Sequence, residues 1–577
     1  MSLDQTAAEA MVAQLESYGV DTVFGLCGHT NIALLDAMGR SRIRFVIARH
    51  EQAAAHAADG YARATGRPGV LLVHVGPGLT NAVTGVLTAA MDSVPLVVIA
   101  GDIPSYYHGR HPHQEVNLHA DADQTAIYRP FVKRAWQVHR AEDLARYTER
   151  AFWTATAGRP GAVLLSVPMD HFSRPVPAAA YPLAVPERPG LPADVAGRIA
   201  DLLIGGQRPL VYLGGGLRRG PGLDALRRLV EHLDIPVAHS LMAKGTLPDS
   251  HPLLLGMPGF WGLELTNRYT READVVLALA TRFAETDASS WDRRYTWQFP
   301  PARLVQIDID PAEIGRNFPV TVGAVADVAD AVQAIERAVV ERQPAPTRRP
   351  GLRETIGATR RTLFTESRER GASEQFPLRP ERILTDLRAI LPPDAVLVTD
   401  VGWNKNGVAQ CYELPDDGRF ITPGGASTMG FGPAAAVGVQ IAQPDRTVVA
   451  LIGDGGMGAQ LPAVPMAVEQ NAPVLFVVMN NRSHGTISDL QAANFGRSFG
   501  CDFAGPDGQP YSPDFAAYGR ACGADGYSVD SAAGFGEALR AALAARRPAV
   551  LDVPMVNEPV PTPGHWNIKD IYQGVFE

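Results

Sequence analysis

The sequence has little of what disulfide-stapled, membrane-spanning or nucleic-acid-binding proteins need. Its four cysteines, Cys27, Cys411, Cys501 and Cys522, stand too far apart for a disulfide framework or a zinc site. No apolar run reaches the length of a transmembrane helix. The formal net charge of -9 argues against nucleic acid as the main partner, because a phosphate backbone attracts an excess of Lys and Arg. We therefore expect no nucleic-acid partner and no membrane.

The N-terminus also lacks the pattern of a signal peptide. Its first residues are typical of an amphipathic helix carrying Asp4, Glu9 and Glu16, with no basic stretch before an apolar core. Hydrophobic residues make up 46% of the chain and charged residues 20%, which is usual for globular cores. A chain of 577 residues is long enough for three or four domains. We expect a large cytoplasmic enzyme.

Two proline-rich linkers divide the chain into blocks. We expect an N-terminal domain over 1–170, a central domain over 194–340, a third domain over 377–556 and a tail over 557–577. Each block alternates apolar strand patterns with helix patterns, which predicts an α/β fold of doubly wound parallel sheets. The first and third blocks are candidate copies of one fold, although no sharp repeat is visible.

The most informative run lies in the third block. An apolar strand is expected over 447–452, a helix over 460–470 and a second strand over 474–479. Gly453, Asp454, Gly455 and Gly456 follow the first strand, and Asn481 follows the second. A right-handed crossover brings both strand ends to one edge of the sheet, so carboxylate and amide oxygens meet there. These ligands suit Mg²⁺ together with phosphate oxygens of a bound molecule.

This run resembles the signature of thiamine diphosphate (ThDP) enzymes, which extends from GDG to NN over a similar spacing. The resemblance implies that Asp454, Asn481 and the carbonyl of Ser483 hold Mg²⁺. It also implies that the neighbouring glycines cradle the diphosphate.

A second segment carries an independent resemblance. The stretch from "RHEQAAAHAADGYARATG" to "HVGPGLTN" is similar to the pyrimidine-binding domain of the acetohydroxyacid synthase, pyruvate oxidase and benzoylformate decarboxylase superfamily. Glu51 matches the glutamate that hydrogen-bonds the aminopyrimidine and activates the cofactor, and Gly76 and Asn81 belong to the same site. In this superfamily the two ThDP-binding domains meet across a subunit interface, which implies a homodimer, or a homotetramer built from two dimers.

Further cofactor contacts follow from the same resemblance. Met429 matches the bulky residue that bends ThDP, and the carbonyl of Ser427 would bind the aminopyrimidine edge. The loop "TDVGWNKNG" matches the one that meets the diphosphate, and His484 and Gly485 would line the same pocket. The loop residues implied are Gly402, Trp403 and Asn404.

The chemistry of such an enzyme is largely that of ThDP, and the protein positions and selects the substrate. Besides Glu51, the residues that we expect at the reacting centre are polar groups next to the cofactor signatures. They are His29, His113, Gln114 and His484, with His74 and Lys133 as further pocket candidates. Each histidine has a structural interpretation about as strong as a catalytic one.

The substrate has three interpretations. Leu490 stands where acetohydroxyacid synthases have a tryptophan. The segment 281–289 reads "TRFAETDAS" and does not have the arginine that ends the "RFDDR" stretch of that family. We therefore favour a 2-hydroxyacyl-CoA lyase type, which cleaves a 2-hydroxyacyl-CoA to formyl-CoA and an aldehyde or ketone, with the tail 557–577 as a lid. The glutamate expected in such lyases near Ala492 is absent. The alternative is an acetolactate-synthase-like decarboxylating carboligase acting on pyruvate or another 2-oxo acid. The second alternative is an FAD-dependent 2-oxo acid oxidase.

The central block bears on the same question. A glycine-rich turn after a strand, "VYLGGGLRRG", can bind a nucleotide phosphate, and its relatives hold FAD, the ADP part of CoA, or nothing there. The candidate nucleotide contacts come from this turn and from two later strand ends. They are Gly214, Gly215, Gly216, Arg218, Arg219, Arg282, Asp308 and Asp310.

Overall fold

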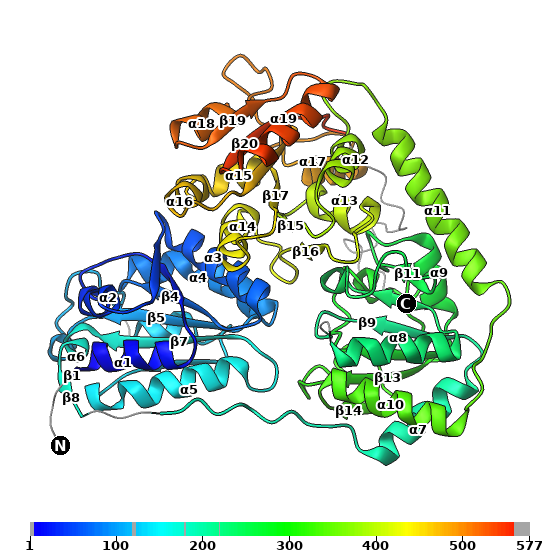
Figure 1. Ribbon diagram of the computed structural model, residues 1–577, viewed down its shortest axis with the longest axis horizontal. Helices are drawn as coiled ribbons and strands as arrows, with labels where there is room; N and C mark the ends of the chain where they lie inside the picture. Colours follow the sequence, from blue (N-terminus) through cyan, green and yellow to red (C-terminus); the bar gives the residue numbers. More distant parts are fainter. Residues whose placement is uncertain (1–4, 118–122, 178–180, 218–219, 559–577) are drawn as a thin grey trace.

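The computed structural model describes residues 5–117, 123–177, 181–217 and 220–558. Within them, three six-stranded sheets, whose strand pairs are all parallel, form three domains arranged as a triangle (Figure 1). Apolar clusters lie on both faces of each sheet, under helices. The predicted α/β fold of doubly wound parallel sheets is therefore confirmed.

The N-terminal sheet has the strand order β3-β2-β4-β5-β7-β6. Its strands are β2 (Thr22–Gly25), β3 (Arg44–Ile47), β4 (Gly69–Val73), β5 (Leu96–Asp102), β6 (Arg134–Gln137) and β7 (Ala162–Pro168). The helices are α1 (Ala7–Ser17), α2 (Ile32–Gly39), α3 (Glu51–Thr65), α4 (Pro77–Met91), α5 (Leu144–Thr156) and α6 (Met169–Phe172). A short antiparallel pair, β1 (Gln5–Thr6) and β8 (Pro175–Val176), joins the two ends of the domain.

The C-terminal sheet has the order β16-β15-β17-β18-β20-β19. Its strands are β15 (Val396–Thr399), β16 (Arg419–Ile421), β17 (Val448–Gly453), β18 (Leu475–Asn480), β19 (Asp525–Ser528) and β20 (Ala549–Pro554). Its helices are α12 (Pro380–Ile390), α13 (Trp403–Cys411), α14 (Phe431–Ala442), α15 (Asp454–Ala459), α16 (Ala463–Glu469), α17 (Gly485–Phe495), α18 (Phe515–Ala521) and α19 (Ala532–Ala545).

The central sheet has the order β11-β10-β9-β12-β13-β14. Its strands are β9 (Pro209–Leu213), β10 (Val237–His239), β11 (Leu254–Gly256), β12 (Val275–Leu279), β13 (Arg303–Asp308) and β14 (Val322–Val325). Around it lie α7 (Ala193–Gly205), α8 (Pro221–Leu233), α9 (Glu264–Glu272) and α10 (Val328–Arg342).

Strand order separates the three domains into two types. Numbered within each domain, the first and third sheets share one order, in which the first strand lies between the second and the third. The central sheet instead has the order 3-2-1-4-5-6. In both types, ligands bind at the carboxyl ends of the strands, where the chain switches direction across the sheet. The switch points lie between β2 and β4, between β9 and β12, and between β15 and β17.

The N-terminal and C-terminal domains share one hydrophobic core at the crossing of α3 and α14. Glycines bring the two backbones together there. A Cβ on Gly60 would lie 2.2 Å from the carbonyl O of Ala435, and a Cβ on Gly438 would lie 1.9 Å from that of Ala57. No side chain fits at either glycine without moving backbone, so the crossing fixes how the two domains are placed.

A long helix that the sequence pattern did not predict, α11 (Leu352–Gly371), joins the central domain to the C-terminal domain along the right side of Figure 1. Few of its residues are buried, so the helix does not need an apolar stripe, and its sequence has none. Arg360 anchors it by donating from Nη2 to the carbonyl O of Asp249, at 2.7 Å. Lys244 pairs with the Asp249 carboxylate at 2.6 Å, which also accepts from the N–H of Leu414.

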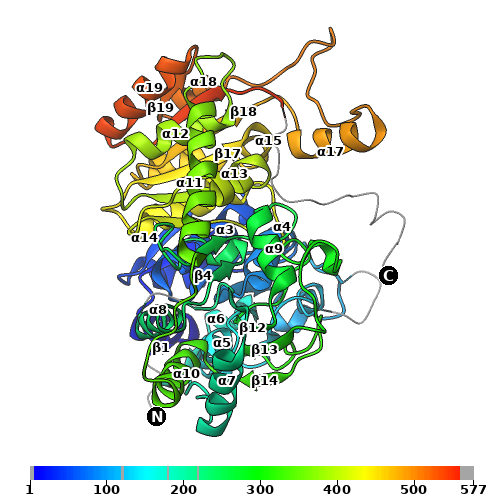
Figure 2. The same cartoon turned by 90° about the vertical axis from the view of Figure 1, so that its right-hand side faces the viewer.

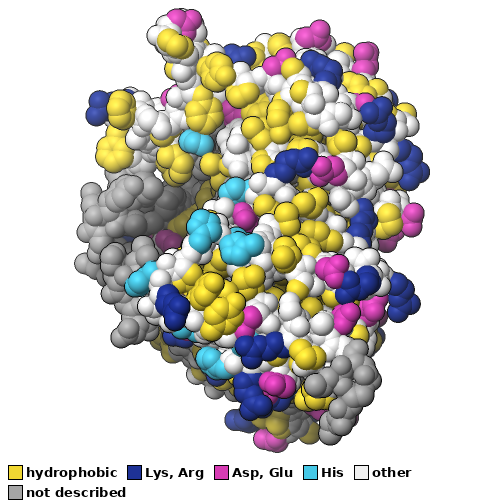
Figure 3. Space-filling model, turned by 90° about the vertical axis from the view of Figure 1, so that its left-hand side faces the viewer, with side chains coloured by type: hydrophobic (Ala, Val, Ile, Leu, Met, Phe, Trp, Pro, Cys, Tyr) yellow, Lys and Arg dark blue, Asp and Glu magenta, His cyan; other side chains and the backbone are white. Residues whose placement is uncertain are grey.

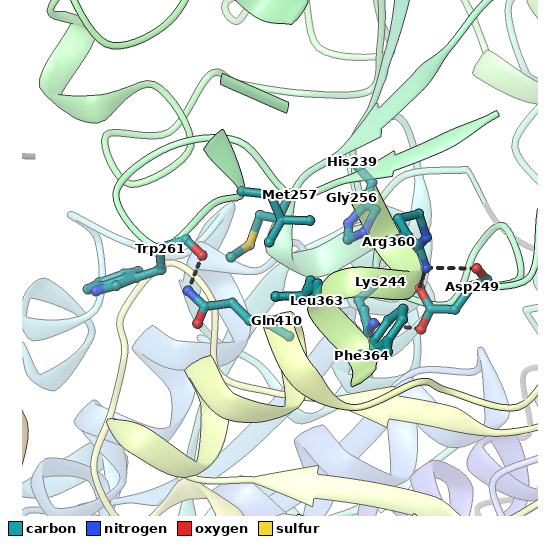
Figure 4. Close-up of a pocket in the computed structure, with 12 residues that line it drawn as sticks. His239, Lys244, Asp249, Gly256, Met257, Trp261, Arg360, Leu363, Phe364 and Gln410 are labelled. Carbon is teal, nitrogen blue, oxygen red and sulfur yellow. Dashed lines mark hydrogen bonds and ion pairs between the residues drawn. The ribbon is translucent and has the colours of Figure 1, made fainter. Parts of the chain in front are cut away.

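These buried charges line the small cavity drawn in Figure 4. Its volume is about 10 Å³, enough for about one water molecule and far too small for a substrate. We assign this cavity to the packing of α11 against its neighbours. Among the described residues, no helix is long and apolar enough to cross a membrane.

Candidate active site

Three helices begin at one edge of the C-terminal sheet. α13 follows β15 after Gly402, α15 begins at Asp454 directly after β17, and α17 begins after His484, beyond β18. Their N-terminal N–H groups have no partner inside the helix and carry the positive end of the helix dipole. The edge therefore suits a diphosphate. The sequence placed a helix over 460–470, whereas the structure starts helical turns six residues earlier, at Asp454 itself.

Oxygen atoms converge at this edge. With Nδ2 of Asn481 donating to Oδ1 of Asn557 at 2.9 Å, Oδ1 of Asn481 lies 3.1 Å from Oδ1 of Asp454 and 2.9 Å from the carbonyl O of Ser483. These three oxygen atoms all accept hydrogen bonds, and no hydrogen lies between them. Either a cation bound between them or a 180° flip of the Asn481 amide would relieve their repulsion. A hard divalent cation such as Mg²⁺ prefers this set of ligands, so the residues present fit the metal implied by the sequence.

The electrostatics of Asp454 agree with this fit. Burial raises the pKa of Asp454 to about 6, and Oδ2 is buried without a hydrogen-bond partner among the described residues. An uncompensated buried carboxylate is costly unless a cation accompanies it. Within the described ranges, no three His, Cys, Asp or Glu side chains form a metal cluster.

Other predicted cofactor residues gather around the same edge. A Cβ on Gly455 would lie 2.8 Å from Cε1 of His484 and 3.7 Å from the sulfur of Met429. The nearest atom to a Cβ on Gly453 would be Nδ2 of Asn404, at 3.9 Å. The structure therefore brings these residues together, and their individual roles stay predictions. Trp403 opens α13, Gly456 packs on a buried carboxylate, and Gly485 opens α17 beside Asn481.

Sequence reasoning missed two buried residues that shape this edge. Asp400 accepts from the N–H groups of Gly430 and Gly432, each at 2.9 Å, and thereby fixes the turn that carries Met429. Lys405 donates to Oγ of Ser427 at 3.0 Å. Burial raises the pKa of Asp400 to about 6 and lowers the pKa of Lys405 to about 8. The signal was present in "TDVGWNKNG", where two charged residues stand in an otherwise buried segment.

The N-terminal domain positions Glu51, the carboxylate that the resemblance implies as the activating group. Glu51 is the first residue of α3, as expected, and is buried. Its Oε2 accepts from Nδ2 of Asn81 on α4, at 2.9 Å. A Cβ on Gly78 would lie 3.4 Å from Oε1 of Glu51 and 3.0 Å from Cβ of His74, so Gly78 lies between these two side chains.

The predicted polar residues of the N-terminal domain form one cluster beside Glu51. The rings of His29 and His74 have centroids 4.6 Å apart, and those of His29 and His113 are 6.2 Å apart. Nε2 of His74 lies 2.7 Å from Oε1 of Gln114, whose backbone approaches Gly76. Lys133 is not part of this cluster, because its ammonium group donates to the carbonyls of Ala157 and Arg159.

Some of the nucleotide contacts predicted in the central domain lie at its switch point, and others have a different explanation. Gly214, Gly215 and Gly216 follow β9 at its switch point, and Arg282 and Asp308 lie at the ends of β12 and β13. A Cβ on Gly214 would lie 1.8 Å from the carbonyl O of Ala280, so tight packing alone explains that glycine. Asp310 is engaged by Arg159 of the N-terminal domain at 3.3 Å. Arg218, Arg219 and the tail from residue 559 lie outside the described residues.

Two doubly wound domains of one topology, one with a buried glutamate and the other with a diphosphate and metal edge, define a ThDP enzyme. The chain matches the three parts of that family: "Thiamine pyrophosphate enzyme, N-terminal TPP binding domain" over 5–127, "central domain" over 196–335 and "C-terminal TPP binding domain" over 400–553. The chain belongs to the thiamine pyrophosphate enzyme family and is a ThDP-dependent enzyme that makes or breaks carbon–carbon bonds.

Three relatives that are named as acetolactate synthase large subunits align with nearly the whole chain. A "Probable acetolactate synthase large subunit" from Methanocaldococcus jannaschii is 32% identical and covers 95% of this chain and 91% of its own length. The acetolactate synthase large subunit of Parasynechococcus marenigrum is 34% identical, with 95% and 87% covered. The isozyme 3 large subunit of Escherichia coli is 32% identical, with 91% and 90% covered. These names favour the acetolactate-synthase-like alternative and give no support to the 2-hydroxyacyl-CoA lyase interpretation.

Proposed function

We propose that the protein is a decarboxylating carboligase that joins two 2-oxo acids, with pyruvate as the donor. The observation that carries the proposal is the similarity of at least 91% of the chain to the three acetolactate synthase large subunits described above. In the overall reaction the donor loses CO₂, and its carbonyl carbon forms a new bond to the carbonyl carbon of the acceptor. The electron pair of the broken bond makes the new one, and a proton goes to the acceptor oxygen.

ThDP, when bound, supplies a nucleophilic carbon that adds to a carbonyl and stabilises the electron pair left by CO₂. The residues of this chain do the rest. Glu51, fixed by Asn81, would hold and share a proton at the pyrimidine ring. Asp454, Asn481 and Ser483 would hold Mg²⁺, and the N-termini of α13, α15 and α17 would hold the diphosphate. The polar side chains beside Glu51 would line the pocket that takes the substrate.

The test is a comparison of products. Purified protein with Mg²⁺ and ThDP is given pyruvate alone, and CO₂ release and acetolactate are measured. A second reaction contains a 2-hydroxyacyl-CoA and is assayed for formyl-CoA. We expect acetolactate from the first reaction and nothing from the second, and the reverse result would restore the lyase interpretation. Glu51→Gln should be inactive in both reactions, and Glu142→Gln, at an exposed site, should behave as wild type.

We further propose a nucleotide at the switch point between β9 and β12. Arg282 lies there half-buried near the carboxylates of Asp92, Asp308 and Glu313, and no hydrogen bond from its guanidinium is found among the described residues. Burial lowers the pKa of Arg282, and an anionic phosphate would compensate this desolvated charge. Chromatography of the nucleotide released by denatured protein separates FAD from ADP or CoA. A yellow protein that bleaches with substrate would indicate the FAD-dependent oxidase.

An assembly of identical chains is part of the proposal. α17 and the loop after it project from the body of the molecule next to the metal edge (Figure 2). Ile487, Phe495, Phe499 and Tyr511 on this projection are exposed, with Phe499 at 80%. Apolar side chains of this size are typical of a surface that another subunit covers. We expect a homodimer or homotetramer, and a monomer in analytical ultracentrifugation would contradict it.

A further inference from the structure

A buried hydrogen-bond chain sets the direction of the groups beside Glu51. Oγ1 of Thr30 lies 2.8 Å from Nδ1 of His74, and Nε2 of His74 lies 2.7 Å from Oε1 of Gln114. Gly28 makes room for the imidazole, because a Cβ there would lie 2.3 Å from Cγ of His74. The ring is thus held on both nitrogens and cannot turn freely.

The donor and acceptor roles along this chain follow from Thr30. Its hydroxyl oxygen is buried and already accepts from the N–H of Val75 at 3.3 Å. Its own O–H needs an acceptor, and within the described part of the chain only Nδ1 of His74 is in reach. Nδ1 is therefore the acceptor and Nε2 carries the hydrogen, which it donates to Oε1 of Gln114. The oxygen of Gln114 is consumed, so its amide presents N–H groups to the site.

The neighbouring imidazoles extend this donor surface outward. His29 packs edge-on against His74, and His113 stacks on His29, both with exposed side chains. Histidines gather on the face of the molecule shown in Figure 3. The backbone of Gly78 lies between His74 and Glu51. The amide of Gln114 and the imidazoles of His29 and His113 thus form a row of hydrogen-bond donors that starts beside Glu51, with His74 as the ring that orients Gln114.

We propose that Gln114, His29 and His113 form a subsite for a second oxyanion, carried on the side chain of a 2-oxo acid substrate. This inference rests on the proposed function and names its substrate class. The ring centroids from His74 to His29 and from His29 to His113 are 4.6 and 6.2 Å apart, so the row is longer than a single carboxylate. The 2-oxo acid's own carboxylate therefore leaves donors over for a second acidic group. His74 and Thr30 act as positioning residues, because they fix which atoms Gln114 presents.

Two acids of equal chain length test the proposal. 2-Oxoglutarate ends in a carboxylate where 2-oxopentanoate ends in a methyl group. A site built around hydrogen-bond donors rejects the analogue that cannot accept, so we expect wild-type holoenzyme to show a KM about tenfold or more lower for 2-oxoglutarate. Binding to the Glu51→Gln holoenzyme, measured by calorimetry, should show the same preference without turnover.

Variants test whether the preference for 2-oxoglutarate comes from His29 and His113 or from any histidine on the surface of the domain. His29→Phe and His113→Phe should each reduce the preference, and the double variant should abolish it while ThDP binding is retained. His139→Phe, at an exposed histidine elsewhere in the domain, is the matched control and should change nothing. Thr30→Val should weaken the preference by freeing the tautomer of His74, and Thr30→Ser, which keeps the hydroxyl, should restore it.

The two proposals fail in different ways. If no 2-oxo acid releases CO₂ but Glu51→Gln still prefers 2-oxoglutarate in a histidine-dependent manner, the carboligase proposal is wrong and the subsite stands. Equal affinity of Glu51→Gln for the two acids, or a preference that survives in the His29→Phe and His113→Phe double variant, would overturn the subsite.

Discussion

Asn81 donates from Nδ2 to Oε2 of Glu51 at 2.9 Å, which links the first turns of α3 and α4. The carboxylate is therefore oriented before any cofactor binds, with Oε1 left on the side of Gly78. An oriented carboxylate loses little freedom when it meets a ring nitrogen, which is what activation of a cofactor at this point requires.

Glu51→Gln should abolish turnover and leave cofactor binding intact. The amide keeps the shape but cannot share a proton, so we expect kcat to fall by about 10²- to 10⁴-fold. Calorimetry should show ThDP affinity within a few-fold of wild type. Near-wild-type turnover would remove Glu51 from the mechanism.

Asp454→Ala should weaken cofactor binding itself. Without this carboxylate, Mg²⁺ would keep only the amide of Asn481 and the carbonyl of Ser483 as expected protein ligands. At a ThDP concentration 100 times the wild-type Kd, bound cofactor stabilises wild type by about 2.7 kcal/mol, and this shift should be lost in Asp454→Ala. Thermal unfolding with and without Mg²⁺ and ThDP measures it, with Asp445→Ala as an exposed control. An unchanged shift would place the metal elsewhere.

Gly60→Ala should destabilise the contact between the two ThDP-binding domains. Its Cβ would lie 2.2 Å from the carbonyl O of Ala435, so α3 and α14 must move apart. We expect a loss of about 2–3 kcal/mol, seen as a lower urea midpoint. Gly39→Ala is the control, because a Cβ there meets nothing within 4 Å. In helix α2 it should instead stabilise, by up to about 1 kcal/mol.

Asp287→Asn should change the pH dependence of stability. Burial raises the pKa of Asp287 to about 6 from its usual 3.8. In the folded state the proton is held more tightly than in the unfolded state. The wild type therefore loses stability as pH rises from about 4 to 6, and the loss is complete above that window. Relative to wild type, the variant should gain about 1–3 kcal/mol between pH 4 and pH 7.5. Urea unfolding at both pH values checks this, and a pH-independent difference would contradict it.

The strands and the cofactor edge could be predicted because their signals are local. A continuous apolar run such as 447–452 predicted β17 to within one residue at each end, since a strand buried on both faces leaves that pattern. The domain boundaries expected from the linkers stay predictions.

Other features depend on contacts between distant segments. The Thr30, His74 and Gln114 chain joins three loops, and no periodicity in any one of them indicates it. Asp400 follows β15, and the two N–H groups that it accepts from, those of Gly430 and Gly432, lie 30 and 32 residues further along the chain. Helix α11 was missed because a helix exposed along most of its length needs no apolar stripe.

The shared core of the first and third domains has a consequence during synthesis on the ribosome. Helix α3 is complete at Thr65, but α14, which covers it, begins only at Phe431. About 370 residues separate the two, and at ~5–20 residues per second their translation takes roughly 20–70 s. For that interval the alanine-rich face of α3 is exposed on the nascent chain. Early misassembly of this protein is therefore expected at that face, and holding chaperones that bind it should raise the yield of folded enzyme.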